Sequence, residues 1–221
     1  MLPELVKALL KPKAYPEPTQ RIELMQTQMS FIFLADNYVY KVKKAVDLGY
    51  LDYTTLEKRH FYCQKEVELN RRLCPEVYLG VVPITRDKGN ILIGGRGEII
   101  EYAVKMRRLP QEAMMNVLLV KNQVSPEMIT SVAQKLAAFH QKAETNAKIS
   151  AFGDIKAIKQ NTEENFTQTN RYIGKTISQE KYQRIKDYTD SFIKKNTPLF
   201  RQRIKERKIR DCHGDVHAAH I

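Results

Sequence analysis

Three histidines and an aspartate gather near the end of the sequence, in His213-Gly214-Asp215-Val216-His217-Ala218-Ala219-His220. In phosphoryl transfer an aspartate in such a loop accepts or orients the proton of the acceptor hydroxyl, and a side chain five positions later holds a metal ion that bridges the phosphates. Asp215 and His220 have this spacing. The alternative is incidental metal binding, with His213, His217 and His220 as ligands beside Asp215.

Lysines on a predicted strand form the second candidate. In Tyr38-Val39-Tyr40-Lys41-Val42-Lys43, the period-2 alternation of a strand places Val39, Lys41 and Lys43 on one face. A strand lysine that contacts nucleotide phosphates is a part of kinase sites. We favour Lys41 for this role and keep Lys43 as an alternative.

A glutamate on the predicted helix that follows could pair with this lysine. Glu66 shares one helix face with Tyr62, Leu69 and Leu73, at intervals of four, seven and eleven residues. A carboxylate inside an apolar stripe is costly unless a cation accompanies it. We therefore predict an ion pair between Glu66 and the strand lysine, whereas Glu68 faces solvent.

The letters around these residues resemble a known family. The C-terminal octapeptide resembles HGDxHxxN, the catalytic-loop motif of the aminoglycoside phosphotransferase and choline kinase superfamily, relatives of protein kinases. Residues 47–52 (Asp-Leu-Gly-Tyr-Leu-Asp), 56–59 (Leu-Glu-Lys-Arg) and 79–84 (Leu-Gly-Val-Val-Pro-Ile) resemble a bacterial group of that superfamily, often fused to an ATP-binding domain. The resemblance spans residues 19–221.

This resemblance implies an ATP-dependent kinase that phosphorylates a hydroxyl of a small molecule. Asp215 would be the catalytic base, and Lys41 with Glu66 would position the phosphates. Val39 would pack on adenine. Val104 and Met106 would offer backbone groups to adenine at a hinge between two lobes, although an ordinary strand end fits the same letters.

Three departures from the family pattern limit this hypothesis. The turn at residues 26–30 has no glycine, so the hydroxyls of Thr27 and Ser30 would have to replace it near phosphate, and a role unrelated to phosphate is equally open. His220 stands where the motif has asparagine, which puts Mg²⁺ in doubt. The second metal-binding aspartate would lie beyond Ile221. We expect a chain truncated inside its catalytic loop, with little activity.

Composition leaves two further hypotheses. The 221-residue chain carries a net charge of +12, which attracts nucleic acid or nucleotide phosphate. The basic residues are spread without a zinc-finger or RNA-binding signature, so nucleic acid is the weaker hypothesis. A nucleotide-binding pseudokinase or regulatory module is the stronger rival. Residues 154–211, where such kinases recognise the acceptor, contain 15 lysines and arginines against 8 acids, which disfavours a polycationic aminoglycoside.

Compartment and membrane association follow from the cysteines and the apolar runs. Cys63, Cys74 and Cys212 lie far apart without CxxC spacing, which argues against disulfides and a zinc site and favours buried thiols. No window approaches the roughly 18 apolar residues of a membrane span. We predict a cytoplasmic protein whose partners are ATP and a small-molecule acceptor.

The predicted elements place strands first and helices second. We expect an α+β protein with a protein-kinase-like two-lobe fold: residues 1–105 as a lobe of antiparallel sheet plus one helix, and residues 106–221 as a hinge and an incomplete, mainly helical lobe. A capping box at Thr54 and Glu57 would begin the first long helix. His140 would be packed. The predicted helices are 3–10, 55–73, one starting after Ser125, 155–172 and 179–204; the predicted strands are 22–25, 31–34, 38–43, 77–84, 90–93, 98–106 and 208–210.

Overall fold

The computed structural model describes residues 3–221, and the chain forms two compact units. The first comprises the residues up to Val124 together with Ile221, and the second comprises Ser125–His220. The first unit holds an antiparallel sheet with a long helix, and the second is mainly helical. This content is compatible with the predicted α+β class. The lobe boundary expected after residue 105 stays a prediction.

A six-stranded antiparallel sheet forms the first unit, with strand order β1-β2-β3-β6-β4-β5. Aromatic and β-branched runs separated by short turns explain the strands. The predicted hairpin at residues 31–43 is confirmed, with register Ile32 opposite Lys41. The strands are β1 Glu23–Gln26, β2 Ser30–Leu34, β3 Tyr38–Lys43, β4 Tyr78–Asp87, β5 Asn90–Ile93 and β6 Glu98–Arg107.

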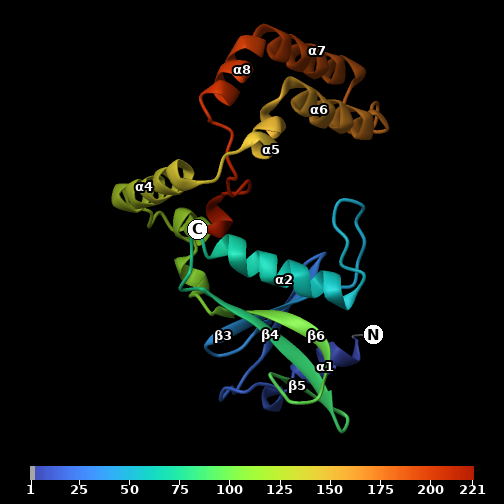
Figure 1. Cartoon of the computed structure of the whole chain (residues 1–221), viewed down its shortest axis with the longest axis vertical. Coiled ribbons are helices and arrows are strands. Elements are labelled where there is room, and N and C mark those ends of the chain that lie inside the picture. Colours follow the sequence, from blue (N-terminus) through green and yellow to red (C-terminus); the bar gives the residue numbers. More distant parts are fainter. Residues whose placement is uncertain (1–2) are drawn as a thin grey trace. The chain divides into compact units, whose positions relative to one another are not determined.

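The two faces of this sheet bury different partners. On one face Tyr40 and Ala103 join the core that includes helix α1 (Glu4–Leu9). On the other face Val104 packs with Cys63 and Val67 of helix α2 (Leu56–Asn70), which Figure 1 shows lying along the sheet. Because neighbouring residues of a strand point to opposite faces, Lys41 and Lys43 lie on the α2 face while Tyr40 lies on the α1 face.

Helix α2 begins one residue later than its predicted capping box. Thr55, not Thr54, is the N-cap, and its hydroxyl accepts the Lys58 amide at 3.3 Å. The Thr54 hydroxyl donates instead to Asp52, 2.6 Å away, so the local turn uses it before the helix starts. Leu69, which was predicted to lie on the apolar face of this helix, is exposed. The buried face of α2 passes instead through Cys63 and Val67.

The second unit contains five α-helices within its described residues. Ser125 caps α4 as predicted, and its hydroxyl accepts the Met128 amide. The single helix predicted over 179–204 is wrong, because Pro198 lacks an N–H and begins a new helix after Asn196. The bounds are α4 Pro126–Lys142, α5 Ala147–Ser150, α6 Ile155–Asn170, α7 Gln179–Lys195 and α8 Thr197–Lys205; α3, Met115–Val120, belongs to the first unit.

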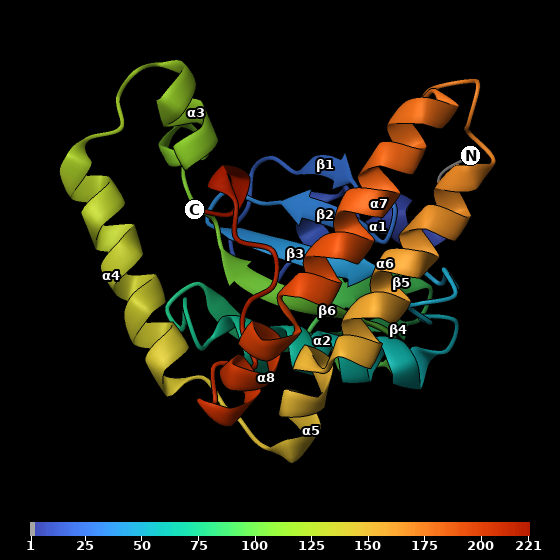
Figure 2. The same ribbon diagram turned by 90° about the horizontal axis from the view of Figure 1, so that it is seen from above.

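Helices α6 and α7 lie side by side, as Figure 2 shows. The Tyr182 hydroxyl donates to the Phe166 carbonyl at 3.0 Å, and the two rings meet edge to face. No residue of α4 is buried, and the same holds for α6. His140 is exposed, so its predicted packed role is wrong for this structure: the face of α4 that carries it is left uncovered.

Residues 208–210 have no regular secondary structure and do not form the predicted strand. The Arg210 guanidinium donates to the carbonyls of Gln141 and Ala143, and the Asp211 amide donates to Glu144. These bonds tie the segment before the histidine-rich loop to the end of α4.

The cysteines and helices bear on the remaining predictions. Cys63, Cys74 and Cys212 are free thiols. Cys63 is buried, but Cys212 is exposed and does not have the expected buried role. Within residues 3–221, no helix combines the length and the apolar character that crossing a membrane requires.

Candidate functional site

Two lysines of β3 hold one glutamate of α2. Lys41 Nζ lies 2.9 Å from Glu66 Oε1, and Lys43 Nζ lies 2.6 Å from Glu66 Oε2. The sequence left Lys41 and Lys43 as alternatives, whereas the structure brings both to the predicted glutamate. Strand alternation explains this, since residues two apart project from the same face and can reach the two oxygens of one carboxylate.

The two lysines differ in access to solvent. The Lys43 side chain is 4% exposed and its ammonium lies over the Tyr53 ring, 4.8 Å from the centroid. The Lys41 side chain is 30% exposed, and that of Glu66 is 13% exposed. Lys43 is therefore enclosed behind the glutamate, and Lys41 is the member of the trio that a ligand can reach.

Electrostatic interactions favour the ionised forms of Glu66 and Lys43. Burial alone would raise the pKa of Glu66, but the charges and hydrogen bonds of Lys41 and Lys43 outweigh it and the pKa lies below its ordinary value. Burial likewise opposes the charge on Lys43, and the nearby Glu66 carboxylate raises the pKa of that lysine above its ordinary value. The site therefore has one negative and two positive charges, a net charge suited to an anion.

A second buried ion pair fastens α2 to the sheet. Arg59 Nε lies 2.8 Å from Glu101 Oε2 of β6, and the guanidinium also donates to the carbonyls of Tyr53 and Thr54. Burial raises the pKa of Glu101 despite this partner and a bond from the Tyr102 amide. We did not predict this pair. Its signal in the sequence was a glutamate flanked by the apolar runs Ile99-Ile100 and Tyr102-Ala103-Val104.

The turn before β2 is closed on itself. The Thr27 hydroxyl accepts the Ser30 amide at 3.0 Å and the Met29 amide at 3.3 Å. Ser30 is buried. To donate to a phosphate, the Thr27 hydroxyl would have to give up its 3.5 Å bond to the Ser30 carbonyl, and the buried Ser30 hydroxyl would have to become accessible.

The predicted adenine contacts fall inside the sheet. Val39 is half-buried on β3 and stands opposite Met106. Val104 is fully buried, and both Val104 and Met106 lie where β6 is paired on its two sides, with β3 and with β4. The backbone N–H and C=O groups of such a strand are hydrogen-bonded to the neighbouring strands. The backbone contacts to adenine predicted for Val104 and Met106 therefore conflict with the strand pairing.

The histidine-rich loop brings three of its side chains together. One ligand atom from each of Asp215, His217 and His220 lies within 4.8 Å of the others. His220 Nδ1 is 3.6 Å from Asp215 Oδ2 and 2.9 Å from the Asp215 carbonyl oxygen, while His217 Nε2 is 4.0 Å from Asp215 Oδ1. Asp215 and His220, which the sequence singled out by their spacing, are in local contact, and His217 joins them; the roles predicted for the two residues stay predictions.

Chemistry at this loop depends on its exposure. The Asp215 side chain is 74% exposed, and both histidines are about half exposed. His213 takes a different part, because its Nδ1 accepts the Asp215 amide at 3.3 Å and shapes the turn. The carboxylate is free to accept a proton or to bind a cation from solvent.

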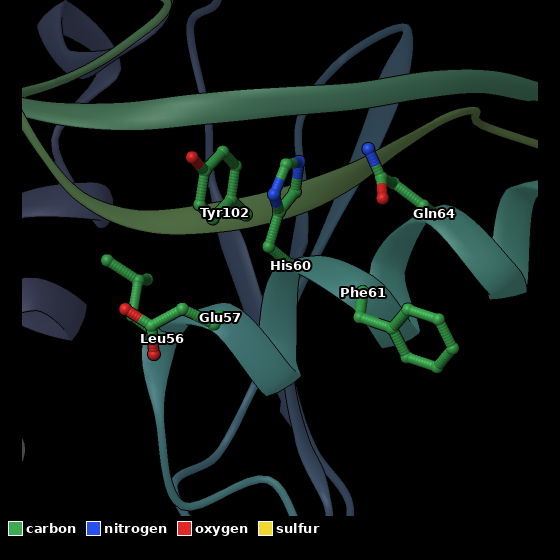
Figure 3. Close-up of a pocket in the computed structure, with 6 residues that line it drawn as sticks. All are labelled: Leu56, Glu57, His60, Phe61, Gln64 and Tyr102. Carbon is green, nitrogen blue, oxygen red and sulfur yellow. The ribbon is translucent and has the colours of Figure 1, made fainter.

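A shallow hollow of about 200 Å³ opens between α2 and β6. Figure 3 shows His60 beside Tyr102; the two rings are stacked with their centroids 3.8 Å apart. The hollow is small and mixed in polarity, and it contains neither lysine of the trio. Its lining residues are Leu56, Glu57, His60, Phe61, Gln64 and Tyr102.

Comparison with known proteins yields relatives without an assigned activity. No family model and no solved structure matches the chain. The chain is 30% identical over 200 residues to uncharacterized proteins of Mycobacterium bovis and of two strains of Mycobacterium tuberculosis. The match covers 90% of this chain, which spans 39% of the length of these curated relatives.

Proposed function

We propose that the chain is part of an ATP-dependent phosphotransferase with a protein-kinase-like two-lobe fold, which phosphorylates a hydroxyl of a small molecule. The observation that carries this proposal is the ion pair between Lys41 of β3 and Glu66 of α2. A strand lysine held by a helix glutamate is the arrangement with which kinases position nucleotide phosphates.

Because Lys43 also pairs with Glu66, Lys41 can leave the glutamate without removing its last cationic partner. When Lys41 turns toward phosphate, a lone Glu66 carboxylate would lose its partner in a poorly solvated site. Lys43 keeps its contact with Glu66 Oε2, so the carboxylate stays compensated. We assign Lys41 to the phosphates and Lys43 to holding Glu66.

Asp215 is the proposed base for the transfer. Its carboxylate accepts the proton of the acceptor hydroxyl as that oxygen bonds to the γ-phosphorus, and the bond from phosphorus to the oxygen of departing ADP breaks. The basic composition of residues 154–211 favours a neutral or anionic acceptor over a polycation.

The loop does not suit Mg²⁺. That ion prefers six oxygen ligands in near-octahedral geometry, whereas the loop offers one carboxylate and two imidazoles. We therefore assign no Mg²⁺ to Asp215 or His220.

A thermal-shift titration with ATP tests the proposal. A ligand at about 100 times its dissociation constant stabilises the native state by about 2.7 kcal/mol, so ATP should raise the melting temperature of the wild-type chain. Lys41→Met should abolish this rise. Lys65→Met, which removes an exposed lysine of α2 that pairs with Glu68, is the matched control and should keep it. An equal rise in Lys41→Met would contradict the proposal.

A nucleotide-binding regulatory module is the second candidate, and the turn at residues 26–30 favours it. Because Thr27 and Ser30 are engaged or buried, this turn offers the phosphates less than a glycine-rich loop does. The regulatory hypothesis expects an ATP-induced thermal shift that depends on Lys41, but no ADP release with a panel of hydroxyl acceptors. Acceptor-dependent ADP release would eliminate it.

A further inference from the structure

We propose that Asp215, His217 and His220 form a binding site for a divalent transition-metal ion of the Zn²⁺ type, and that this site discriminates against Mg²⁺. The inference goes beyond the proposed phosphotransferase activity, which uses only the carboxylate of the loop. It concerns three side chains within six consecutive residues, so the site is built from local contacts.

The backbone of the loop brings the ligands together. The His220 amide donates to the His217 carbonyl at 2.8 Å and closes a short 3₁₀ helix, Ala218–His220. His220 Nδ1 also contacts the Asp215 carbonyl oxygen. This turn brings both imidazoles beside one carboxylate, with a ligand atom of each within 4.8 Å of the others.

The ligand atoms need only a small closure to bind an ion. Bonds of about 2.0–2.1 Å to Zn²⁺ in tetrahedral geometry place neighbouring ligand atoms about 3.4 Å apart. His220 Nδ1 is 3.6 Å from Asp215 Oδ2, His217 Nε2 is 4.0 Å from the other carboxylate oxygen, Oδ1, and one ligand atom of each residue lies within 4.8 Å of the others. The side chains are largely exposed, so rotation about their side-chain bonds can supply this movement without disturbing a core.

The donor set determines the class of ion. Imidazole nitrogen with carboxylate oxygen suits Zn²⁺ and other first-row transition ions, whereas Mg²⁺ and Ca²⁺ prefer oxygen alone. Three protein ligands leave the fourth tetrahedral position for water, as in open zinc sites. The exposure of the loop leaves space for that water.

Two hydrogen bonds would be exchanged on binding. The Asp215 carbonyl oxygen can only accept, so His220 Nδ1 donates to it at 2.9 Å, and this proton must move to Nε2 before Nδ1 can coordinate an ion. His217 Nδ1 accepts the Ala219 amide at 3.3 Å, which leaves the ring proton on Nε2 when the imidazole is neutral. Coordination through Nε2 would move the proton to Nδ1 and release this long bond. The amide is at an exposed turn, where water can replace the lost acceptor.

Calorimetric titration of the whole chain with ZnCl₂ tests the site. Cys212 is an exposed thiol beside the loop and could bind zinc itself, so all proteins carry Cys212→Ser. We expect one equivalent of Zn²⁺ to bind, and at least tenfold weaker binding in His217→Asn and in His220→Asn. Co²⁺ should give the visible absorption of a tetrahedral complex, and MgCl₂ at a hundredfold excess should not displace it.

His140→Asn is the matched control, since it removes an exposed histidine of α4 and leaves the loop intact. It should bind Zn²⁺ like the parent protein. Unchanged zinc affinity in both loop variants, an equal loss in His140→Asn, or displacement by Mg²⁺ would each overturn the proposal. Circular dichroism verifies that the variants fold. The Lys41-dependent ATP shift is measured separately, so failure of the metal site and failure of the proposed function are distinguishable.

Discussion

Two charged clusters of this chain have related chemistry and opposite surroundings. Glu66 is enclosed with Lys41 and Lys43 between β3 and α2, whereas Asp215 extends from a loop with 74% of its side chain exposed. In the first cluster the fold positions the charges, and their ion pairs in turn stabilise the fold. In the second, solvent already satisfies the carboxylate, so its charge is available to a ligand. The comparison predicts that substitutions in the first cluster change stability and substitutions in the second do not.

The largest effect is expected from Glu66→Ala. Removing the carboxylate leaves Lys43 buried without its anion, and breaking a buried pair in this way costs about 3–5 kcal/mol of unfolding free energy. Urea titration followed by far-UV circular dichroism measures it without adding salt. Glu68→Ala, on the same helix with a side chain 61% exposed, should stay within about 0.5 kcal/mol. Equal losses of unfolding free energy in the two variants would contradict the idea that the buried cluster, unlike exposed charges, stabilises the fold.

A smaller difference should separate the two lysines. Lys43→Met removes the enclosed partner of Glu66 and should cost about 1–3 kcal/mol. Lys41→Met removes a partly exposed partner and should cost less than about 1 kcal/mol. The same urea titration measures both. If Lys41→Met were the more damaging substitution, the assignment of Lys43 as the holding residue would be wrong.

The acid dependence of stability should respond in opposite directions to two buried glutamates. The folded pKa of Glu66 is below its ordinary value of 4.5, so its contribution is complete above that pH and is lost as pH falls through the folded pKa. The folded pKa of Glu101 is above that value, so its contribution is present at low pH and is lost as pH rises through the folded pKa.

Urea titrations between pH 3 and 6 test these signs. Glu66→Gln should flatten the loss of stability on acidification, because the group responsible for it is gone. Glu101→Gln should steepen the loss, because a group that opposes it is removed. Parallel curves for the two variants would show that Lys41 and Lys43 do not lower the pKa of Glu66 relative to that of Glu101.

The smallest effect is expected at the exposed loop. Asp215→Asn should change the unfolding free energy by less than about 0.5 kcal/mol, since the substitution leaves no buried charged partner without its counter-charge. The urea midpoint measures this. A loss comparable to that of Glu66→Ala would show that the loop is part of the folding core.

Much of the local structure could be predicted from residue patterns. The hairpin at residues 31–43 and the cap at Ser125 follow from turn and capping chemistry that acts over a few residues. The break between α7 and α8 has a local cause as well, since Pro198 marks it. The exposure of Leu69 and His140 could not be predicted, because periodicity identifies a face of a helix but not what covers it.

By itself the sequence determined that Lys41 and Lys43 share a strand face, that Glu66 needs a cation, and that Asp215, His217 and His220 are close neighbours. Each follows from a repeat of two residues on a strand, from the cost of a buried charge, or from short separation along the chain. Only the tertiary structure decided that both lysines meet the same carboxylate, that one of them is enclosed, and that Arg59 pairs with Glu101, 42 residues away. Those outcomes depend on which element packs across from each face, and no local repeat specifies that.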